Sequence, residues 1–191
     1  MGLFDFFSGG PDCQLKRHSK RAMNLNAQAE DREASLHWLA QDGSEQAILG
    51  LLGRYSVTYE HQMKDLNEKE LVFELLETLG EQVCAPIKTW ARRAPKFARP
   101  LQLVDKFEGE EATVTLLVEM LALENDPFKP EKKRQILIKL AEYIDERIVP
   151  AIEPCLRDFD EGIRYAAVEA VLSQPDEVVR GHLASSIADE K

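Results

Sequence analysis

The densest group of side chains that could bind a charged partner lies between residues 88 and 99. Five cations and two aromatic rings fall within this stretch, although the 191-residue chain carries a net charge of −10: Lys88, Trp90, Arg92, Arg93, Lys96, Phe97 and Arg99. Guanidinium groups bond carboxylates or phosphates through two parallel hydrogen bonds, so the stretch is a candidate surface for an anionic group. The structural alternative is that the cations stabilise the C-terminal end of a helix while Trp90 packs in the core.

Arg157 extends this hypothesis to a second place in the chain. It follows Ile148 by nine residues, just as Arg92 follows Val83 by nine. If the two segments are equivalent helices, they present arginine at equivalent positions. We therefore predict that a partner contacts Trp90, Arg92, Arg93, Lys96 and Arg157.

The start of the chain is a second candidate for docking. Four apolar side chains are concentrated near the N-terminus and four cations follow them: Leu3, Phe4, Phe6 and Phe7, then Lys16, Arg17, Lys20 and Arg21. We expect the apolar segment to cover the open end of the first helix pair, because terminal repeats must hide their apolar face. The other interpretations are docking in a groove of a partner and, as the minor one, peripheral contact with a membrane.

Motifs of the common enzyme classes are missing from the sequence. The four histidines lie far apart, and none belongs to a His-x3-His or His-Glu motif that would place two metal ligands on one helical face. There is no nucleophile elbow, phosphate-binding loop or dinucleotide fingerprint. The adjacent Glu110 and Glu111 suit the start of a helix, where anionic groups are favourable. We expect a non-enzymatic protein that holds no metal and no other cofactor.

Composition places the chain among globular proteins. Hydrophobic residues make up 44% and charged residues 30%. No apolar run approaches the roughly 20 residues that span a bilayer, and the start lacks the pattern of a secretory signal, so we expect a cytoplasmic protein. Cys13, Cys84 and Cys155 are widely spaced and are expected to be free thiols. The negative charge disfavours general binding to nucleic acid.

Hydrophobic periodicity predicts helices from about Asp31 onward. Apolar residues recur at helical spacing, and no stretch shows the two-residue alternation of a strand. Glycine, proline, asparagine and aspartate separate the periodic segments. The predicted helices form five pairs: 31–41 with 44–55, 67–79 with 81–93, 99–107 with 110–124, 131–144 with 146–157, and 161–173 with 176–187.

The second helices repeat one feature, a pair of large aliphatic residues four positions apart. These pairs are Ile48 and Leu52, Val83 and Ile87, Leu117 and Leu121, Ile148 and Ile152, and Val179 and Leu183. Their first members are 35, 34, 31 and 31 residues apart. A period of this length is typical of stacked helix hairpins, so we predict an all-α solenoid of about five hairpins. Residues 25–191 would form the repeat domain and residues 1–24 an N-terminal extension, and an irregular helical bundle is the alternative.

The segment from Asp158 to Val171 resembles the first helix of a HEAT repeat. Asp160, Ile163, Arg164, Ala167 and Ala170 match that family's pattern of an acidic residue, an Ile-Arg pair and alanines at three-residue steps. A weaker internal similarity links residues 79–87 with residues 144–152. The resemblance extends over about residues 25–187, and outside the last pair it consists mainly of periodicity.

This resemblance, which is to HEAT-like solenoids of the PBS-lyase type, implies that the second helices line a concave surface. It also implies that Asp160 and Arg164, near a hairpin turn, are structural residues that form stabilising contacts between repeat units. Such folds mostly bind partners, so it implies a scaffold or adaptor for a protein whose identity these residues do not specify. One alternative is a HEAT-like protein that binds nucleic acid or excises DNA bases. Another is a HEAT-like lyase or chaperone that acts on a protein client.

Overall fold

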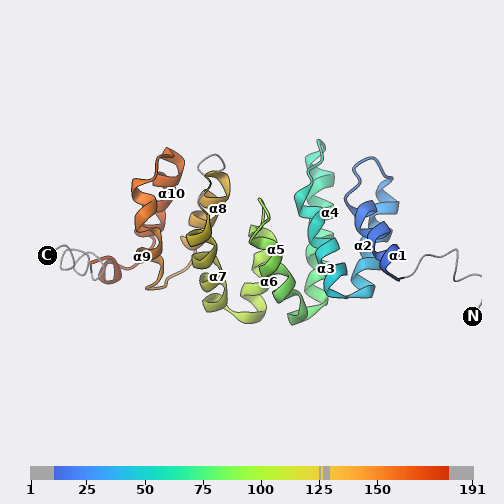
Figure 1. Cartoon of the computed structure of the whole chain (residues 1–191), viewed down its shortest axis with the longest axis horizontal. Coiled ribbons are helices and arrows are strands. Elements are labelled where there is room, and N and C mark those ends of the chain that lie inside the picture. The colour runs from blue at the N-terminus through green and yellow to red at the C-terminus, as the bar shows by residue number, and fades with distance from the viewer. Residues whose placement is uncertain (1–10, 125, 127–129, 181–191) are drawn as a thin grey trace, which may run out of the picture. The chain divides into compact units, whose positions relative to one another are not determined.

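The regular secondary structure is helical throughout the described part of the chain. The computed structural model describes residues 11–124, 126 and 130–180 (Figure 1). The predicted all-α class is therefore confirmed for these ranges. Among their helices, none combines the length and the apolar character that crossing a bilayer requires. The chain divides into two compact units, residues 1–107 and residues 108–191. The predicted separation of residues 1–24 from a repeat domain stays a prediction.

The first unit contains eight described helices. In chain order they are α1 (Pro11–Ala22), α2 (Ala29–Asp42), α3 (Glu45–Leu52), η1 (Gly53–Ser56), α4 (Gln62–Thr78), η2 (Gly80–Val83), α5 (Cys84–Ala91) and α6 (Ala98–Glu108). The predicted pairs 31–41 with 44–55 and 67–79 with 81–93 correspond to α2 with α3 and η1, and to α4 with η2 and α5. These helix predictions are confirmed to within a few residues, apart from the start of α4, which lies five residues earlier than expected.

Local signals in the sequence set the turn between α2 and α3. Gly43 ends α2 with a φ of 63°, and its N–H donates to the carbonyl of Leu39 at 3.1 Å. Glycine suits this left-handed position because it has no Cβ. Ser44 then caps α3, since its hydroxyl accepts a hydrogen bond from the N–H of Ala47 at 3.3 Å. The turn is thus specified by two adjacent residues.

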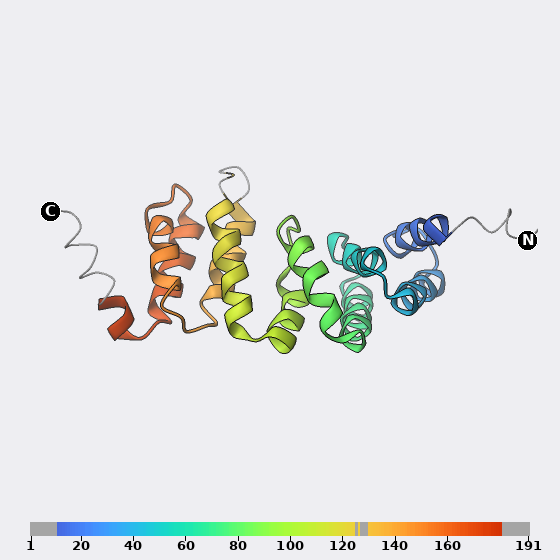
Figure 2. The ribbon, with the colours of Figure 1, turned by 60° about the horizontal axis from the view of Figure 1, so that its bottom comes forward.

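Helix α1 lies ahead of the region where periodicity predicted helices, and the sequence reasoning missed it. It packs against both α2 and α3 (Figures 1 and 2). Gly50 permits the close approach to α3, because a Cβ at this position would lie 2.5 Å from the hydroxyl oxygen of Ser19. Leu15, Ala22 and Met23 are the main apolar residues of the buried face. So sparse an apolar pattern does not predict a helix.

A cluster of buried charges connects α2, η1 and α4. The guanidinium of Arg54 donates to Asp65 at 2.8 Å and to Glu68 at 2.9 Å. Arg32 pairs with Glu68 at 2.5 Å, and Lys69 pairs with Asp65 at 2.5 Å. Both guanidinium groups lie over the ring of Tyr59, at 4.6 and 4.9 Å from its centroid. Each buried charge in this cluster is therefore paired, as stability requires.

The second unit contains the remaining described helices. They are α7 (Glu110–Leu123), α8 (Pro130–Leu140), α9 (Ile148–Ile152), η3 (Glu153–Arg157) and α10 (Glu161–Leu172). The predicted helix 131–144 was too long, because α8 ends at Leu140 and residues 141–147 form a turn. Residues 176–180 are helical, whereas the rest of the predicted helix 176–187 lies outside the described residues.

The turn before α10 is held by the two residues that the resemblance marked as structural. Asp160 caps α10, since its carboxylate accepts a hydrogen bond from the N–H of Ile163 at 3.0 Å. Arg164 donates to the carbonyls of Asp158 and Phe159, both at 2.9 Å. Both side chains therefore have a structural role, but these bonds act within the turn and not between repeat units as expected. Ala166, Ala167 and Ala170 of α10 are buried, and the helix packs against α8, α9 and η3.

Candidate protein-binding site

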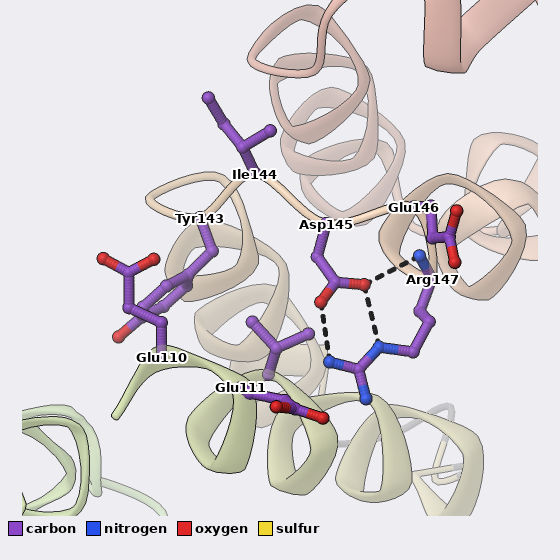
Figure 3. A pocket seen from close by; sticks show the side chains of 8 residues that line it. Glu110, Glu111, Tyr143, Ile144, Asp145, Glu146 and Arg147 are labelled. Atoms are coloured by element: carbon purple, nitrogen blue, oxygen red, sulfur yellow. Dashed lines mark hydrogen bonds and ion pairs between the residues drawn. The ribbon is translucent and has the colours of Figure 1, made fainter. Parts of the chain in front are cut away.

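A hollow of about 650 Å³ lies beside the turn that joins α8 to α9 (Figure 3). Its walls come from the first turns of α7 and from the residues that follow α8. The lining residues are Glu110, Glu111, Val114, Tyr143, Ile144, Asp145, Glu146 and Arg147. Four carboxylates and one guanidinium therefore share one concave surface within the second unit.

The start of α7 supplies two of the carboxylates. Gly109 precedes the helix with a φ of 88°, a left-handed conformation that favours glycine. Glu110 and Glu111 then occupy the first helical turn, where the helix dipole favours negative charge. Val114 and Leu117 are buried on the same helix and fix its rotation. The predicted role of these two glutamates at a helix start is confirmed, and the structure adds their position at the hollow.

The turn after α8 is shaped by an ion pair between Asp145 and Arg147. The guanidinium donates two parallel hydrogen bonds to the carboxylate, at 2.8 and 2.6 Å. The backbone N–H of Arg147 donates to the same carboxylate at 2.9 Å, and the third guanidinium nitrogen donates to the hydroxyl of Thr115 at 2.8 Å. The hydrogen bonds from Arg147 hold the pKa of Asp145 below its usual value. The hydrogen-bond donors of the Arg147 guanidinium are thus bonded to Asp145 and Thr115, within the second unit.

Gln174, which follows α10, also holds the turn between α8 and α9 through hydrogen bonds. Its amide nitrogen donates to the carbonyl of Tyr143 at 2.8 Å, and its amide oxygen accepts from the N–H of Asp145 at 3.2 Å. The side chain of Gln174 is buried. Both polar ends of the amide therefore bond the segment that carries Ile144, which keeps the wall of the hollow in one conformation.

The hollow keeps an excess of negative charge. Arg147 offsets the charge of Asp145, whereas Glu110, Glu111 and Glu146 have no hydrogen-bonding or ion-pair partner for their carboxylates among the described residues. Next to them, Ile144 is 70% exposed, and its side chain points away from the pair of Asp145 and Arg147 (Figure 3). This arrangement suits a cationic side chain next to an apolar one. The described ranges contain no group of three or more His, Cys, Asp or Glu that could hold a metal ion.

The residues predicted to contact a partner between 90 and 96 lie around the end of α5, in the first unit. Trp90 is half-buried, with its ring edge-on to that of Tyr55 at 6.1 Å between centroids. Arg92 and Arg93 are exposed, and Arg92 donates to the carbonyl of Lys88 at 3.3 Å. Lys96 is exposed and donates to the hydroxyl of Thr58 at 3.3 Å. The structure thus brings these four residues together on one segment, where two of the cations also bond within the unit.

The other predicted contacts lie elsewhere. Arg157 is exposed at the end of η3, in the second unit. Leu3, Phe4, Phe6 and Phe7 lie outside the described residues.

Sequence reasoning missed the hollow as a site, although part of its signal was present. Asp145 was the break between two predicted helices, with Glu146 and Arg147 at the start of the second, and Glu111 lies 34 residues before Asp145, about one repeat period away. A repeat of this length brings the corresponding ends of neighbouring helix pairs together. Charged residues one repeat period apart, at the breaks between helices, could therefore have been considered together as a candidate site.

Comparison with protein-family models, with characterised proteins and with solved structures found no match for this chain.

Proposed function

We propose that this chain is a non-enzymatic scaffold or adaptor of the HEAT-like type, and that the hollow in its second unit receives a lysine or arginine side chain of a protein partner. The observation that carries the proposal is the set of three carboxylates, on Glu110, Glu111 and Glu146, that form no ion pair or hydrogen bond among the described residues, although Arg147 attracts Glu111 and Glu146 from a greater distance. They lie beside Ile144, which is exposed.

The solenoid part of the proposal is supported by the burial of the repeated aliphatic pairs. In each second helix for which both positions are described, the two residues are buried: Ile48 and Leu52, Val83 and Ile87, Leu117 and Leu121, Ile148 and Ile152. A regular period of buried pairs is expected when each hairpin hides its apolar stripe against the next. A helical bundle would not require such a period.

A protein partner fits the hollow better than a small cation alone. A metal ion would need several oxygen ligands converging on one point, whereas these carboxylates lie on two separate walls. A lysine or arginine brings the positive charge on a long apolar stem, and a neighbouring apolar side chain can contact Ile144. The pair of Asp145 and Arg147 holds the wall rigid before binding, which lowers the entropic cost of association.

The experiment that tests this proposal selects peptides from a random library displayed on phage, with the purified full chain as bait. We expect enrichment of sequences that place a lysine or arginine next to an aliphatic or aromatic residue. The same selection is run on Glu111→Gln/Glu146→Gln, which preserves side-chain size and removes two negative charges. The enrichment should disappear on this variant because the attraction for a cation is lost.

A matched control is Glu74→Gln/Glu119→Gln, which removes the same charge from exposed positions outside the hollow. It should select the same peptides as the unmodified chain. The proposal is wrong if the unmodified chain enriches no basic motif, or if both double variants select identical peptides. Acidic peptides would point instead to the predicted contacts Trp90, Arg92, Arg93, Lys96 and Arg157.

A further inference from the structure

Helix α1 turns a basic face outward. At 100° per residue, four exposed residues lie within an arc of about 100°, and they form the α1 face: Cys13, Lys16, Arg17 and Lys20. The opposite side, which includes Leu15 and Ala22, packs against α2 and α3. Asp12 is the one acidic residue of the helix, and its position lies outside this arc.

The three cations of the α1 face have no carboxylate partner among the described residues. No ion pair or side-chain hydrogen bond involves any of them, whereas the buried Arg32 and Arg54 of the same unit are paired with carboxylates. A positive field acts at this helix, because burial together with Arg21 and Arg17 lowers the pKa of His18. The α1 face is therefore a positive surface that the described carboxylates of the unit do not neutralise.

Contacts of the inward side hold α1 in one orientation. The ring of His18 stacks on that of Trp38 at 4.3 Å between centroids, and its Nδ1 lies 3.2 Å from the hydroxyl of Ser35. Gly50 lets α1 approach α3 without a clash against Ser19. The α1 face is thus formed before any partner binds, which lowers the entropic cost of association.

The two units of the chain differ in net charge. Residues 1–107 contain 14 lysines and arginines and 15 aspartates and glutamates, whereas residues 108–191 contain 10 and 19. The net charge is thus −1 for the first unit and −9 for the second. The α1 face belongs to the first unit and the hollow to the second. Opposite local charges on different units let two copies attract each other, although each copy is acidic as a whole.

We propose that the α1 face of one copy docks in the hollow of a second copy, so that the chain associates with itself through two different surfaces. The cations of the α1 face then lie against Glu110, Glu111 and Glu146, which form no ion pair among the described residues of their own unit. This inference rests on the proposed function, because it takes the hollow as a receptor for a cation. It adds the identity of the partner.

The hollow complements the α1 face in polarity as well as in charge. Cys13 is a small apolar side chain among the cations, and Ile144 is an exposed apolar side chain beside the glutamates. A nucleic acid or an anionic lipid surface offers phosphates to the cations, but the acidic second unit repels an extended polyanion. The hollow supplies both the carboxylates and the apolar contact, so a second copy is the better partner.

The test is sedimentation equilibrium of the full chain over a range of protein and salt concentrations. We expect reversible association that weakens as salt rises, because exposed charges are screened. Lys16→Glu/Lys20→Glu and Glu111→Lys/Glu146→Lys should each weaken the association at least tenfold, since like charges then face each other. All four substituted side chains are exposed, so both variants should keep the helical circular dichroism of the unmodified chain.

An equimolar mixture of these two variants is the decisive measurement. The second variant keeps its α1 face and the first keeps its hollow, so the mixture should recover most of the association. The matched control is Lys64→Glu/Lys106→Glu, which reverses two other exposed lysines of the first unit. It should associate within about threefold of the unmodified chain. A mixture that recovers nothing, or a control that loses as much as Lys16→Glu/Lys20→Glu, would overturn the inference.

The outcomes also separate this inference from the proposed function. An unmodified chain that stays monomeric up to about 1 mM would reject the second copy as the partner. If the hollow still binds the selected basic peptides, the proposed function stands, whereas failure of both measurements would reject the hollow as a receptor. A monomeric chain that binds duplex DNA or anionic vesicles, and loses this binding in Lys16→Glu/Lys20→Glu, would assign the α1 face to a polyanion instead.

Discussion

The guanidinium of Arg54, which is fully buried, donates a hydrogen bond of 2.8 Å to the carboxylate of Asp65. The same guanidinium donates to Glu68 and to the carbonyl of Val57. Through these bonds η1 is attached to α4, and Arg32 adds α2 to the cluster. The cluster fixes the relative positions of α2, η1 and α4, which an apolar contact alone does with less directional specificity.

We predict that Arg54→Leu destabilises the first unit by about 3–5 kcal/mol, because Asp65, which is buried, and Glu68, which is half-buried, each lose one of their two cationic partners. Both tryptophans of the chain, Trp38 and Trp90, belong to this unit, so urea denaturation followed by tryptophan fluorescence reports on it. The control Lys64→Ala changes an exposed side chain and should stay within about 0.5 kcal/mol. A loss below about 1 kcal/mol for Arg54→Leu would show that the cluster contributes little.

Acid should weaken the first unit through Asp65. Burial by itself raises the pKa of this carboxyl, but hydrogen bonds from Lys69, Arg54 and the N–H of Tyr59 outweigh it, so the pKa lies below its usual value. A carboxyl whose pKa is lower when folded stabilises the protein above its unfolded pKa, near about 4, and loses that contribution as the pH falls further. The free energy of unfolding should therefore decline below about pH 5. Asp65→Asn should show a shallower decline when denaturation is repeated from pH 7 to pH 3.

The close packing of α1 against α3 can be tested by substitution of Gly50. A valine there places a branched side chain where a Cβ would already lie 2.5 Å from Ser19 and 3.3 Å from Leu39. We expect a loss of about 1–3 kcal/mol and displacement of α1, as overpacking in a close contact produces. Displacement should change the fluorescence of Trp38, which stacks on His18, and should speed amide hydrogen exchange in α1. Unchanged exchange would mean that α1 is held without this close approach.

Gln174 should control the rigidity of the hollow in the second unit. Gln174→Ala leaves the carbonyl of Tyr143 and the N–H of Asp145 without their partners, at a cost of about 1–3 kcal/mol. Hydrogen exchange measured by mass spectrometry should show faster exchange in residues 141–147. Gln174→Glu keeps the acceptor for Asp145 and loses the donor to Tyr143, so its exchange should be intermediate. If exchange in all three proteins is the same, Gln174 does not hold the turn.

Much of the fold could be predicted from the sequence because most of its helices carry clear local signals. Periodicity located nine of the α-helices, and Gly43 with Ser44 marked one turn through its backbone chemistry. Helix α1 was missed because its stability comes from contacts such as Gly50 with Ser19, between residues far apart in the chain. The early end of α8 was missed because Arg147 and Gln174 bond Asp145 and hold the turn that follows it.

The candidate site could be predicted less well than the fold. Sequence composition drew attention to the cations around Arg92, since an excess of one charge in a short stretch is visible without a structure. The hollow consists of short segments 32–37 residues apart, each of which is an ordinary helix start or polar turn when considered alone. What makes it a site is the balance of charges. Arg147 forms an ion pair with Asp145, whereas Glu110, Glu111 and Glu146 form none among the described residues. This balance cannot be predicted from the sequence, because it depends on which side chains contact one another in the folded chain.

The most direct test of the proposed function is a charge exchange between the hollow and a peptide obtained from the selection described above. Affinity is measured by isothermal titration calorimetry for the unmodified chain and for Glu111→Lys/Glu146→Lys, each with the selected peptide and with its basic residue replaced by glutamate. We predict that either change alone weakens binding at least tenfold and that the two together restore most of the affinity, since opposite charges again face each other. Binding that is insensitive to the charge of the hollow, or a double exchange that recovers nothing, would contradict the account.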